Sequence, residues 1–136
     1  MILKLRVDHK NQWFVWAWVA IGTKRHRVEF KVDTGCNSLV LSHSTLEGMG
    51  FSVEESNLAK LPPMPGKLAS GDIHTYRKLG AVSLYQNKGQ TAQICEVDAI
   101  CHSTRETHDL LGTEVFRQFS GISFNLVGDK YVELKR

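Results

Sequence analysis

Apolar residues recur along this chain in short runs separated by polar or glycine-containing turns. Residues 13–21 are almost wholly apolar, and in residues 27–32 every second side chain is apolar. A period of two places successive side chains on opposite faces of a β-strand, so both runs predict strands. Residues 22–25 between them contain glycine and polar residues and predict a turn. This part of the chain is therefore expected to fold as a β-hairpin.

The rest of the sequence continues in the same manner. Ser44 and Glu47 have the spacing of a capping box and predict a short helix that ends at residues 48–50. Prolines at 62, 63 and 65 argue against a central strand, so residues 53–66 are expected to form a connecting arm. The other predicted elements are strands at residues 39–41, 80–85, 91–100, 122–126 and 130–134, a hairpin over residues 67–79 with its tip at 70–72, and a helix at 114–119. Many short strands with two small helices predict one all-β domain over residues 1–136, built as a barrel or a sandwich.

The charge balance changes this picture little. The net charge is +3, and the basic residues are scattered along the sequence apart from a small cluster at residues 24–27. A nucleic-acid footprint needs a broader basic face, so no nucleic-acid partner is expected. The aromatic strand at residues 13–18 keeps a small nucleic-acid-binding β-barrel open as an alternative.

The N-terminal residues and the apolar runs bear on location. Residues 1–6 carry charge early and precede no long apolar core, so no signal peptide is expected. The longest apolar run, residues 13–22, is about half the length that a membrane-spanning helix needs. A cytoplasmic protein without a membrane segment is therefore expected.

The three cysteines are Cys36, Cys95 and Cys101. An odd number without a secretory signal predicts reduced thiols. Cys95 and Cys101 lie near His102 and His108, but the spacing does not match a usual zinc site. We therefore expect no metal and no other cofactor.

One aspartate of the chain is followed by Thr-Gly. Asp33, Thr34 and Gly35 come directly after the predicted strand at residues 27–32. Gly35 permits a close backbone approach, and the Thr34 hydroxyl can fix the loop by donating to a carbonyl group. Two carboxylates held close together share one proton, so that one can activate water while the other donates to a substrate carbonyl. A chain with one such motif must obtain the second carboxylate from another copy of itself.

The motif and its surroundings resemble the retropepsin-like aspartic proteases, in particular the retrotransposon and bacterial types. The resemblance rests on residues 32–41 around Asp33, on residues 109–116 with their Leu-Leu-Gly unit, and on the terminal hairpin at 122–134. Residues 68–73 between them look like the flap of these enzymes. The similarity covers roughly residues 15–134, and the order of the pieces makes it more specific than any single motif.

This resemblance implies a closed pepsin-like β-barrel with one or two short helices that forms a homodimer. It implies an aspartic endopeptidase that hydrolyses an extended peptide or polyprotein with a water held between two Asp33 carboxylates. Thr34 would hydrogen-bond across the dimer axis, and Gly35 would accept a substrate backbone group. The flap, at about 67–79, would cover the substrate, and the Leu-Leu-Gly unit would support the catalytic loop. The implied substrate-binding residues are Ala69, Ser70, Gly71, Asp72 and Ile73, and the implied supporting residues are Leu110, Leu111 and Gly112.

Two features of the sequence qualify the implied function. Retroviral members carry an ion pair at the places that correspond to Asn37 and Thr113, which are both uncharged here. A non-catalytic peptide-binding module of the same fold is also compatible with these residues, because fold alone does not determine function.

Overall fold

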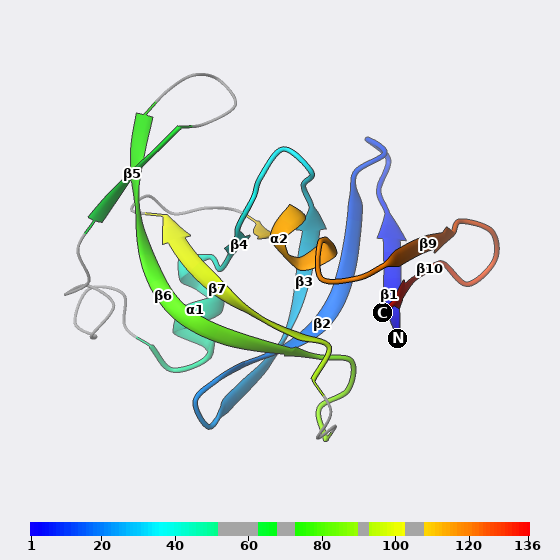
Figure 1. Cartoon of the computed structure of the whole chain (residues 1–136), viewed down its shortest axis with the longest axis horizontal. Helices are drawn as coiled ribbons and strands as arrows, with labels where there is room; N and C mark the ends of the chain where they lie inside the picture. The colour runs from blue at the N-terminus through cyan, green and yellow to red at the C-terminus, as the bar shows by residue number, and fades with distance from the viewer. Residues whose placement is uncertain (52–62, 68–72, 90–92, 103–107) are drawn as a thin grey trace.

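The computed structural model describes residues 1–51, 63–67, 73–89, 93–102 and 108–136, with only the backbone described at residues 63–67, 73–77 and 102. Figure 1 shows the arrangement of the elements in this part of the chain. In chain order they are β1 (Ile2–Val7), β2 (Trp13–Ile21), β3 (Lys24–Val32), β4 (Leu39–Val40), α1 (His43–Gly48), β5 (Pro63–Lys67), β6 (Ile73–Tyr85), β7 (Cys95–His102), β8 (Asp109–Leu111), α2 (Thr113–Phe116), β9 (Gly121–Asn125) and β10 (Tyr131–Lys135).

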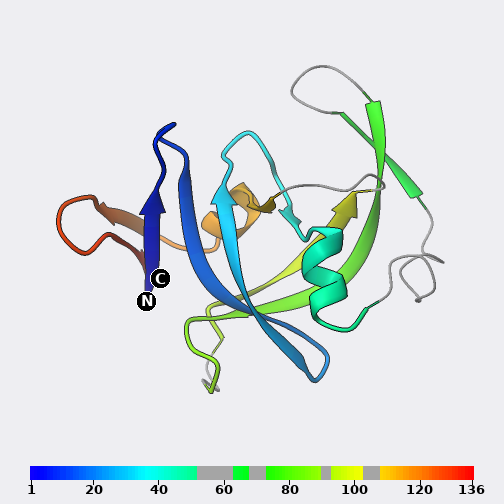
Figure 2. The same cartoon turned by 180° about the vertical axis from the view of Figure 1, so that it is seen from behind.

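Six of these strands close into a barrel. The strand order is β5-β6-β7-β4-β8-β3-β2-β1-β10-β9, and an additional pairing of β6 with β2 joins the central six strands into a ring. Strand β5 extends the sheet beyond β6, while β1, β10 and β9 extend it beyond β2. The two extensions project at opposite sides of the barrel (Figures 1 and 2). The prediction of a closed all-β barrel with two short helices is confirmed.

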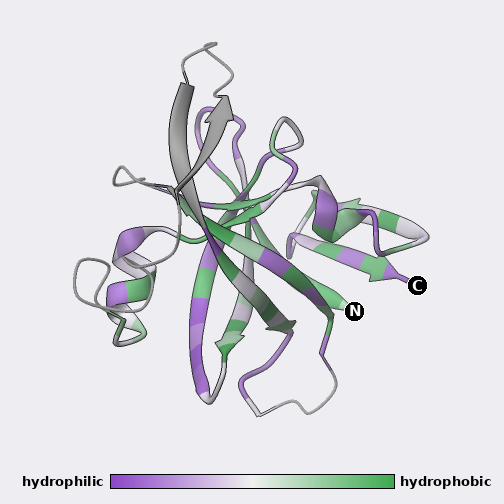
Figure 3. Ribbon diagram, turned by 60° about the vertical axis from the view of Figure 1, so that its left-hand side comes forward, coloured by the Kyte–Doolittle hydropathy of each residue, from purple (hydrophilic) through white to green (hydrophobic). Residues whose placement is uncertain are grey.

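The barrel is filled by one face of each strand. In β2, Val15, Ala17 and Val19 are buried, and in β3 the buried residues are Val28 and Phe30. The same alternation appears as changing hydropathy along the strands in Figure 3. The predicted hairpin of residues 13–32 is thereby confirmed, with its turn shortened to Gly22 and Thr23. None of the helices in the described part of the chain has both the length and the apolar character needed to span a bilayer.

Two expectations about strands were wrong. Residues 63–66 do not belong to a connecting arm, because Pro63–Lys67 forms β5 and pairs antiparallel with β6. Strand β5 lies at the edge of the sheet, where proline is tolerated since no further strand needs its missing N–H. Strand β1 was not predicted at all, although Leu3 and Leu5 alternate with exposed residues and are buried.

Strand β6 is continuous, whereas the sequence suggested a break near residue 80. It runs for 13 residues from Ile73 to Tyr85. Its register against β7 shifts by one residue, since Lys78 pairs with Ile100 and Gly80 pairs with Ala99. This is a β-bulge, and Gly80 adopts the positive φ of 84° that glycine tolerates best.

Helix α1 begins earlier than predicted. Its N-cap is Ser42, whose hydroxyl accepts a hydrogen bond from the Thr45 amide at 3.1 Å. Ser44 and Glu47 therefore do not form the capping box that their spacing suggested. Ser42 takes the N-cap position because its amide donates to the side chain of Asp109, a residue remote in sequence that holds it from outside the helix.

Candidate active site

Asp33 follows the last residue of β3 and begins the loop that leads to β4. Its Oδ1 accepts a hydrogen bond from the Gly35 amide at 3.0 Å, and its carbonyl accepts one from the Cys36 amide at 3.2 Å. No described residue donates to Oδ2. The Asp33 side chain is half-buried, while Thr34 and Gly35 are exposed. One carboxylate oxygen is thus held by the turn, and the other is available to a water molecule or a second group.

Strand β8 anchors the loop that carries Asp33. The Asp33 amide donates to the Leu111 carbonyl at 3.1 Å, and Val32 pairs with Leu111 in a parallel ladder between β3 and β8. Leu111 is buried and Leu110 is half-buried. The residues proposed as a hydrophobic support therefore lie directly beside the loop that carries Asp33.

Gly112 brings the two segments together. A Cβ atom at this position would lie 2.6 Å from the Cys36 carbonyl oxygen and 2.7 Å from the Asn37 carbonyl carbon, with the Ser38 carbonyl closer still. These separations are well inside van der Waals contact, so only glycine fits. The amide of Thr113 next along the chain donates to the Cys36 carbonyl at 2.9 Å.

A neutral contact joins the same segments at the places where retroviral members carry an ion pair. The Thr113 hydroxyl donates to the Asn37 Oδ1 at 3.3 Å, and the Glu114 amide donates to the Asn37 carbonyl at 2.9 Å. The Asp33 loop and the start of α2 are therefore joined by one side-chain and one main-chain hydrogen bond, and neither bond involves a charged group.

Asp109 is a structural residue that sequence reasoning missed as such. Its side chain is buried at 8% exposure. One carboxylate oxygen accepts from the Ser42 amide at 2.7 Å and the other accepts from the Thr45 hydroxyl at 2.7 Å. Through these two short hydrogen bonds, Asp109 fastens the start of α1 to β8. The available signal was the capping pattern Ser42-x-x-Thr45, but its link to residue 109 depends on the fold.

The three cysteines are free thiols. Burial is the main cause that raises the pKa of the Cys36 thiol, and the nearby Asp33 charge adds to it. Burial likewise raises the pKa of Cys95 to about 11. Cys95 and Cys101 lie six positions apart on one strand, about 20 Å, which is too far for both to bind one metal ion.

A shallow groove opens beside the Asp33 loop. It measures about 330 Å³, and Thr34 forms part of its wall. Its apolar lining comes from β3, α2 and β9, with Ile122 and Phe124 each 38% exposed. The complete lining is Val32, Thr34, Thr113, Phe116, Arg117, Ile122 and Phe124.

Most of the predicted substrate-binding residues lie outside the described part of the chain. Ala69, Ser70, Gly71 and Asp72 belong to this group. Ile73 is described as backbone only, and it opens β6 opposite Lys67 of β5. Strands β5 and β6 therefore form a hairpin whose first strand lies earlier in the chain than the expected range of 67–79, while its tip stays a prediction.

A scan against protein-family models found no match, and no curated protein sequence matched the chain. A search of solved structures found a retropepsin-like aspartic protease from Rickettsia conorii, with 17% sequence identity and a TM-score of 0.58. The alignment covers 97% of this chain and 87% of that chain. At this level of identity the likeness establishes the architecture and not the reaction. The chain therefore has a retropepsin-like fold.

Proposed function

We propose that this protein is an aspartic endopeptidase whose site is completed by a second copy of the chain. The observation that carries the proposal is the geometry of Asp33. Its carboxylate leaves the end of a barrel strand, one oxygen is tied to the Gly35 amide, and the other receives no hydrogen bond from the described residues. The retropepsin-like fold supports this reading of the Asp-Thr-Gly motif.

The proposed chemistry needs two such carboxylates. Two carboxylates a few ångströms apart cannot both ionise easily, so they share a proton. The ionised Asp33 removes a proton from a bound water, and the protonated Asp33 of the second copy donates to the peptide carbonyl. The apparent pKa values belong to the pair and not to either residue.

The groove beside Thr34 supports a dimer. The surface that lines it is almost wholly apolar, although two threonines and Arg117 contribute to it, and it adjoins the loop that must meet its symmetry mate. Apolar surface of this kind is stabilised when it is removed from water. In the proposed dimer, the second copy covers Ile122 and Phe124 and brings the two Asp33 loops together.

The expected substrate is a peptide in extended form. In the fold that this chain resembles, an extended peptide pairs its main chain with the flap hairpin, of which β5 and β6 are the described strands. Substrate recognition would then combine main-chain pairing with pockets for alternate side chains.

The decisive experiment compares the parent with Asp33→Asn on a library of peptides. Asparagine keeps an oxygen that can accept from the Gly35 amide, so the fold should persist while cleavage falls to background. Asp98→Asn, at an exposed position of β7, is the matched control and should cleave like the parent. Cleavage is read by mass spectrometry from acidic to neutral pH, because a carboxylate pair shares a proton only between its two apparent pKa values.

Sedimentation of the active sample tests the shared site. A sample that cleaves while wholly monomeric would disprove it, and so would full activity of Asp33→Asn. Saturable peptide binding without cleavage by the parent would favour the binding module of the same fold.

A further inference from the structure

The outer face of β2 carries a row of aromatic side chains. Trp16 and Trp18 alternate with the buried core residues of the strand, so they point away from the barrel interior. Phe14 lies on the same side of the strand but is buried, with the Arg6 guanidinium 4.3 Å from its ring centroid. Trp18 pairs with Arg27 of β3 on one side and with Tyr85 of β6 on the other. The aromatic side chains of this face therefore come from β2 and β6, with basic side chains beside them on β3.

A cation lies near each of the rings of Trp16, Trp18 and Tyr85. The guanidinium carbon of Arg27 lies 4.3 Å from the centroid of Trp16, and that of Arg25 lies 4.0 Å from the centroid of Tyr85. The Lys88 ammonium lies 5.7 Å from the centroid of Trp18. These distances are typical of cation–π interactions. The rings hold the cations against the sheet and keep their charge at the surface.

This face carries a strongly positive net charge, although its basic residues are scattered along the sequence. The described part of the face has six basic side chains and two carboxylates, a local excess of four against the +3 of the whole chain. One carboxylate, Glu29, is already paired with Arg6 at 2.7 Å. We call this surface the basic aromatic face; its charged members are Lys4, Arg6, Arg25, Arg27, Lys88 and Lys130, with Glu29 and Asp129.

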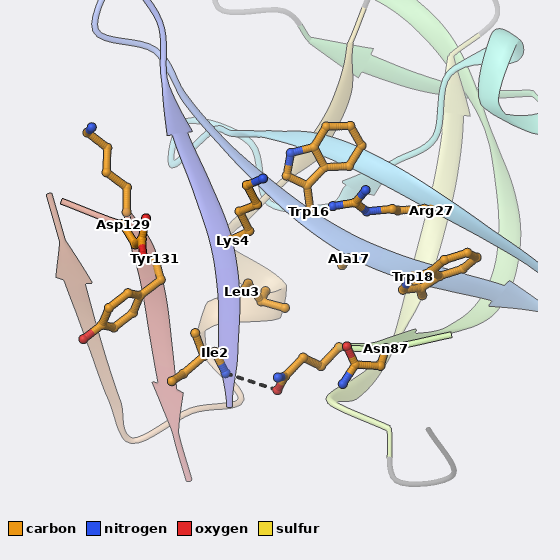
Figure 4. Close-up of a pocket in the computed structure, with 12 residues that line it drawn as sticks. Ile2, Leu3, Lys4, Trp16, Ala17, Trp18, Arg27, Asn87, Asp129 and Tyr131 are labelled. Atoms are coloured by element: carbon orange, nitrogen blue, oxygen red, sulfur yellow. Dashed lines mark hydrogen bonds between the residues drawn. The ribbon is translucent and has the colours of Figure 1, made fainter. Parts of the chain in front are cut away.

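A groove of about 530 Å³ crosses the basic aromatic face. Figure 4 shows Lys4 on β1, Trp16 and Trp18 on β2, and Arg27 on β3 around it. The turn after β6 closes one end, where the Ile2 amide donates to Gln86 Oε1 at 3.2 Å. A concave site of this size can hold a nucleotide unit.

We propose that the basic aromatic face binds single-stranded nucleic acid. Single strands are bound without sequence preference where a basic groove follows the phosphates and aromatic or guanidinium planes stack on the bases. Both components are present in one groove. The basic face forms only when β1, β2, β3 and β6 pair, so the sequence alone did not reveal it. This proposal therefore departs from the expectation of no nucleic-acid partner.

The shape of the site favours a single strand over an anionic membrane. Lipid surfaces are bound by apolar side chains that protrude into the bilayer interface. Here the tryptophans are half-buried and line a groove, and they do not protrude as such side chains must. The site includes no residue of the Asp33 loop, so the proposal does not depend on peptidase activity.

The first test measures charge. Fluorescein-labelled oligothymidylate of about 15 nucleotides is titrated with protein in about 50 to 300 mM NaCl and followed by anisotropy. The parent should bind saturably, with an affinity that falls steeply with salt. The double variant Lys4→Gln/Arg27→Gln should reduce the slope of log affinity against log salt by about 1.4, because each lost phosphate contact to a single strand contributes about 0.7.

Matched variants separate a specific face from a diffuse charge effect. Lys10→Gln/Lys135→Gln removes the same charge from exposed positions outside the groove and should leave the slope unchanged. Trp18→Leu keeps every charge, and loss of its stacking plane should weaken binding about tenfold. Asp33→Asn should bind like the parent, whatever becomes of its peptidase activity.

Three results would overturn the proposal. The first is no saturable binding at the lowest salt, and the second is an equal slope for the two double variants. The third is binding to phosphatidylserine vesicles without binding to the oligonucleotide, which would identify a lipid surface as the partner. Circular dichroism of each variant establishes that it is folded before binding is compared.

Discussion

Replacement of Asp109 by alanine tests how the site is held in place. The carboxylate is buried and accepts hydrogen bonds from the Ser42 amide and the Thr45 hydroxyl, both at 2.7 Å. Asp109→Ala removes both acceptors and leaves the two donors inside the protein. Because Asp109 begins β8, which positions the Asp33 amide through Leu111, the change should loosen the Asp33 loop as well as helix α1.

The expected loss in the free energy of unfolding follows from the two bonds. A buried donor left without a partner costs about 1–3 kcal/mol. Two donors therefore give a loss of about 2–6 kcal/mol. The loss is smaller in practice, because the variant no longer has the desolvation cost of a buried carboxylate. We expect a net loss of about 3 kcal/mol, a large part of the stability of a domain that has about 5–15 kcal/mol in total.

Urea unfolding followed by tryptophan fluorescence measures this loss. With a slope near 2 kcal/mol per molar urea, the midpoint should fall by about 1.5 M. Asp98→Ala, which removes an exposed carboxylate from β7, is the control and should stay within about 0.5 kcal/mol of the parent. Thr45→Val should couple with Asp109→Ala, so that the double variant loses less than the sum of the single losses.

A loss for Asp109→Ala no greater than that for Asp98→Ala would refute the reasoning. It would mean that the cost of burying the carboxylate cancels its two hydrogen bonds. Additive losses in the cycle with Thr45→Val would show that the hydroxyl contact contributes nothing.

Two further predictions concern the loop around Asp33. Gly112→Ala should lower the free energy of unfolding by about 2 kcal/mol or more and abolish the proposed peptidase activity, because its Cβ would lie 2.6 Å from the Cys36 carbonyl oxygen. Gly89→Ala, with open space around it, is the control in the same urea assay, and equal stability of the two variants would contradict the close approach. The raised pKa of the Cys36 thiol leaves less thiolate near neutral pH, so its alkylation by iodoacetamide should be slower than that of a free cysteine and should accelerate as the pH rises. Cys95, whose pKa is about 11, should remain unlabelled in the folded protein, and rapid labelling of Cys36 at neutral pH, read by peptide mass spectrometry, would contradict the effect of burial.

The parts of the fold that were predictable from sequence depend on neighbours along the chain. The hairpin of residues 13–32 was predicted because the alternation of apolar side chains and the glycine turn are local. Strand β1 shows the same alternation, with Leu3 and Leu5 inward, and was overlooked because the run is short and begins the chain. Strand β5 contains prolines that indicate a strand only once the edge of a sheet is known.

The candidate site was predictable only in part, for the same reason. Asp33 was recognised from its immediate successors Thr34 and Gly35. The role of Asp109 depends on two partners more than sixty positions away, and no local pattern reveals that a carboxylate will be buried there. The basic aromatic face likewise forms only when four strands pair, because its members are scattered through the sequence.

The bulge in β6 sets the direction in which Lys78 points. Val82 and Leu84 are buried, and Gly80 lies opposite the buried Ala99 of β7, so an unbroken alternation would turn Lys78 inward as well. The extra residue, Leu79, reverses the phase, so that Lys78 lies opposite Ile100 and stays in solvent. Deletion of Leu79 would therefore change more than the length of β6. Either the Lys78 ammonium group would turn into the apolar interior of the barrel, or the part of β6 before Gly80 would shift its register against β7.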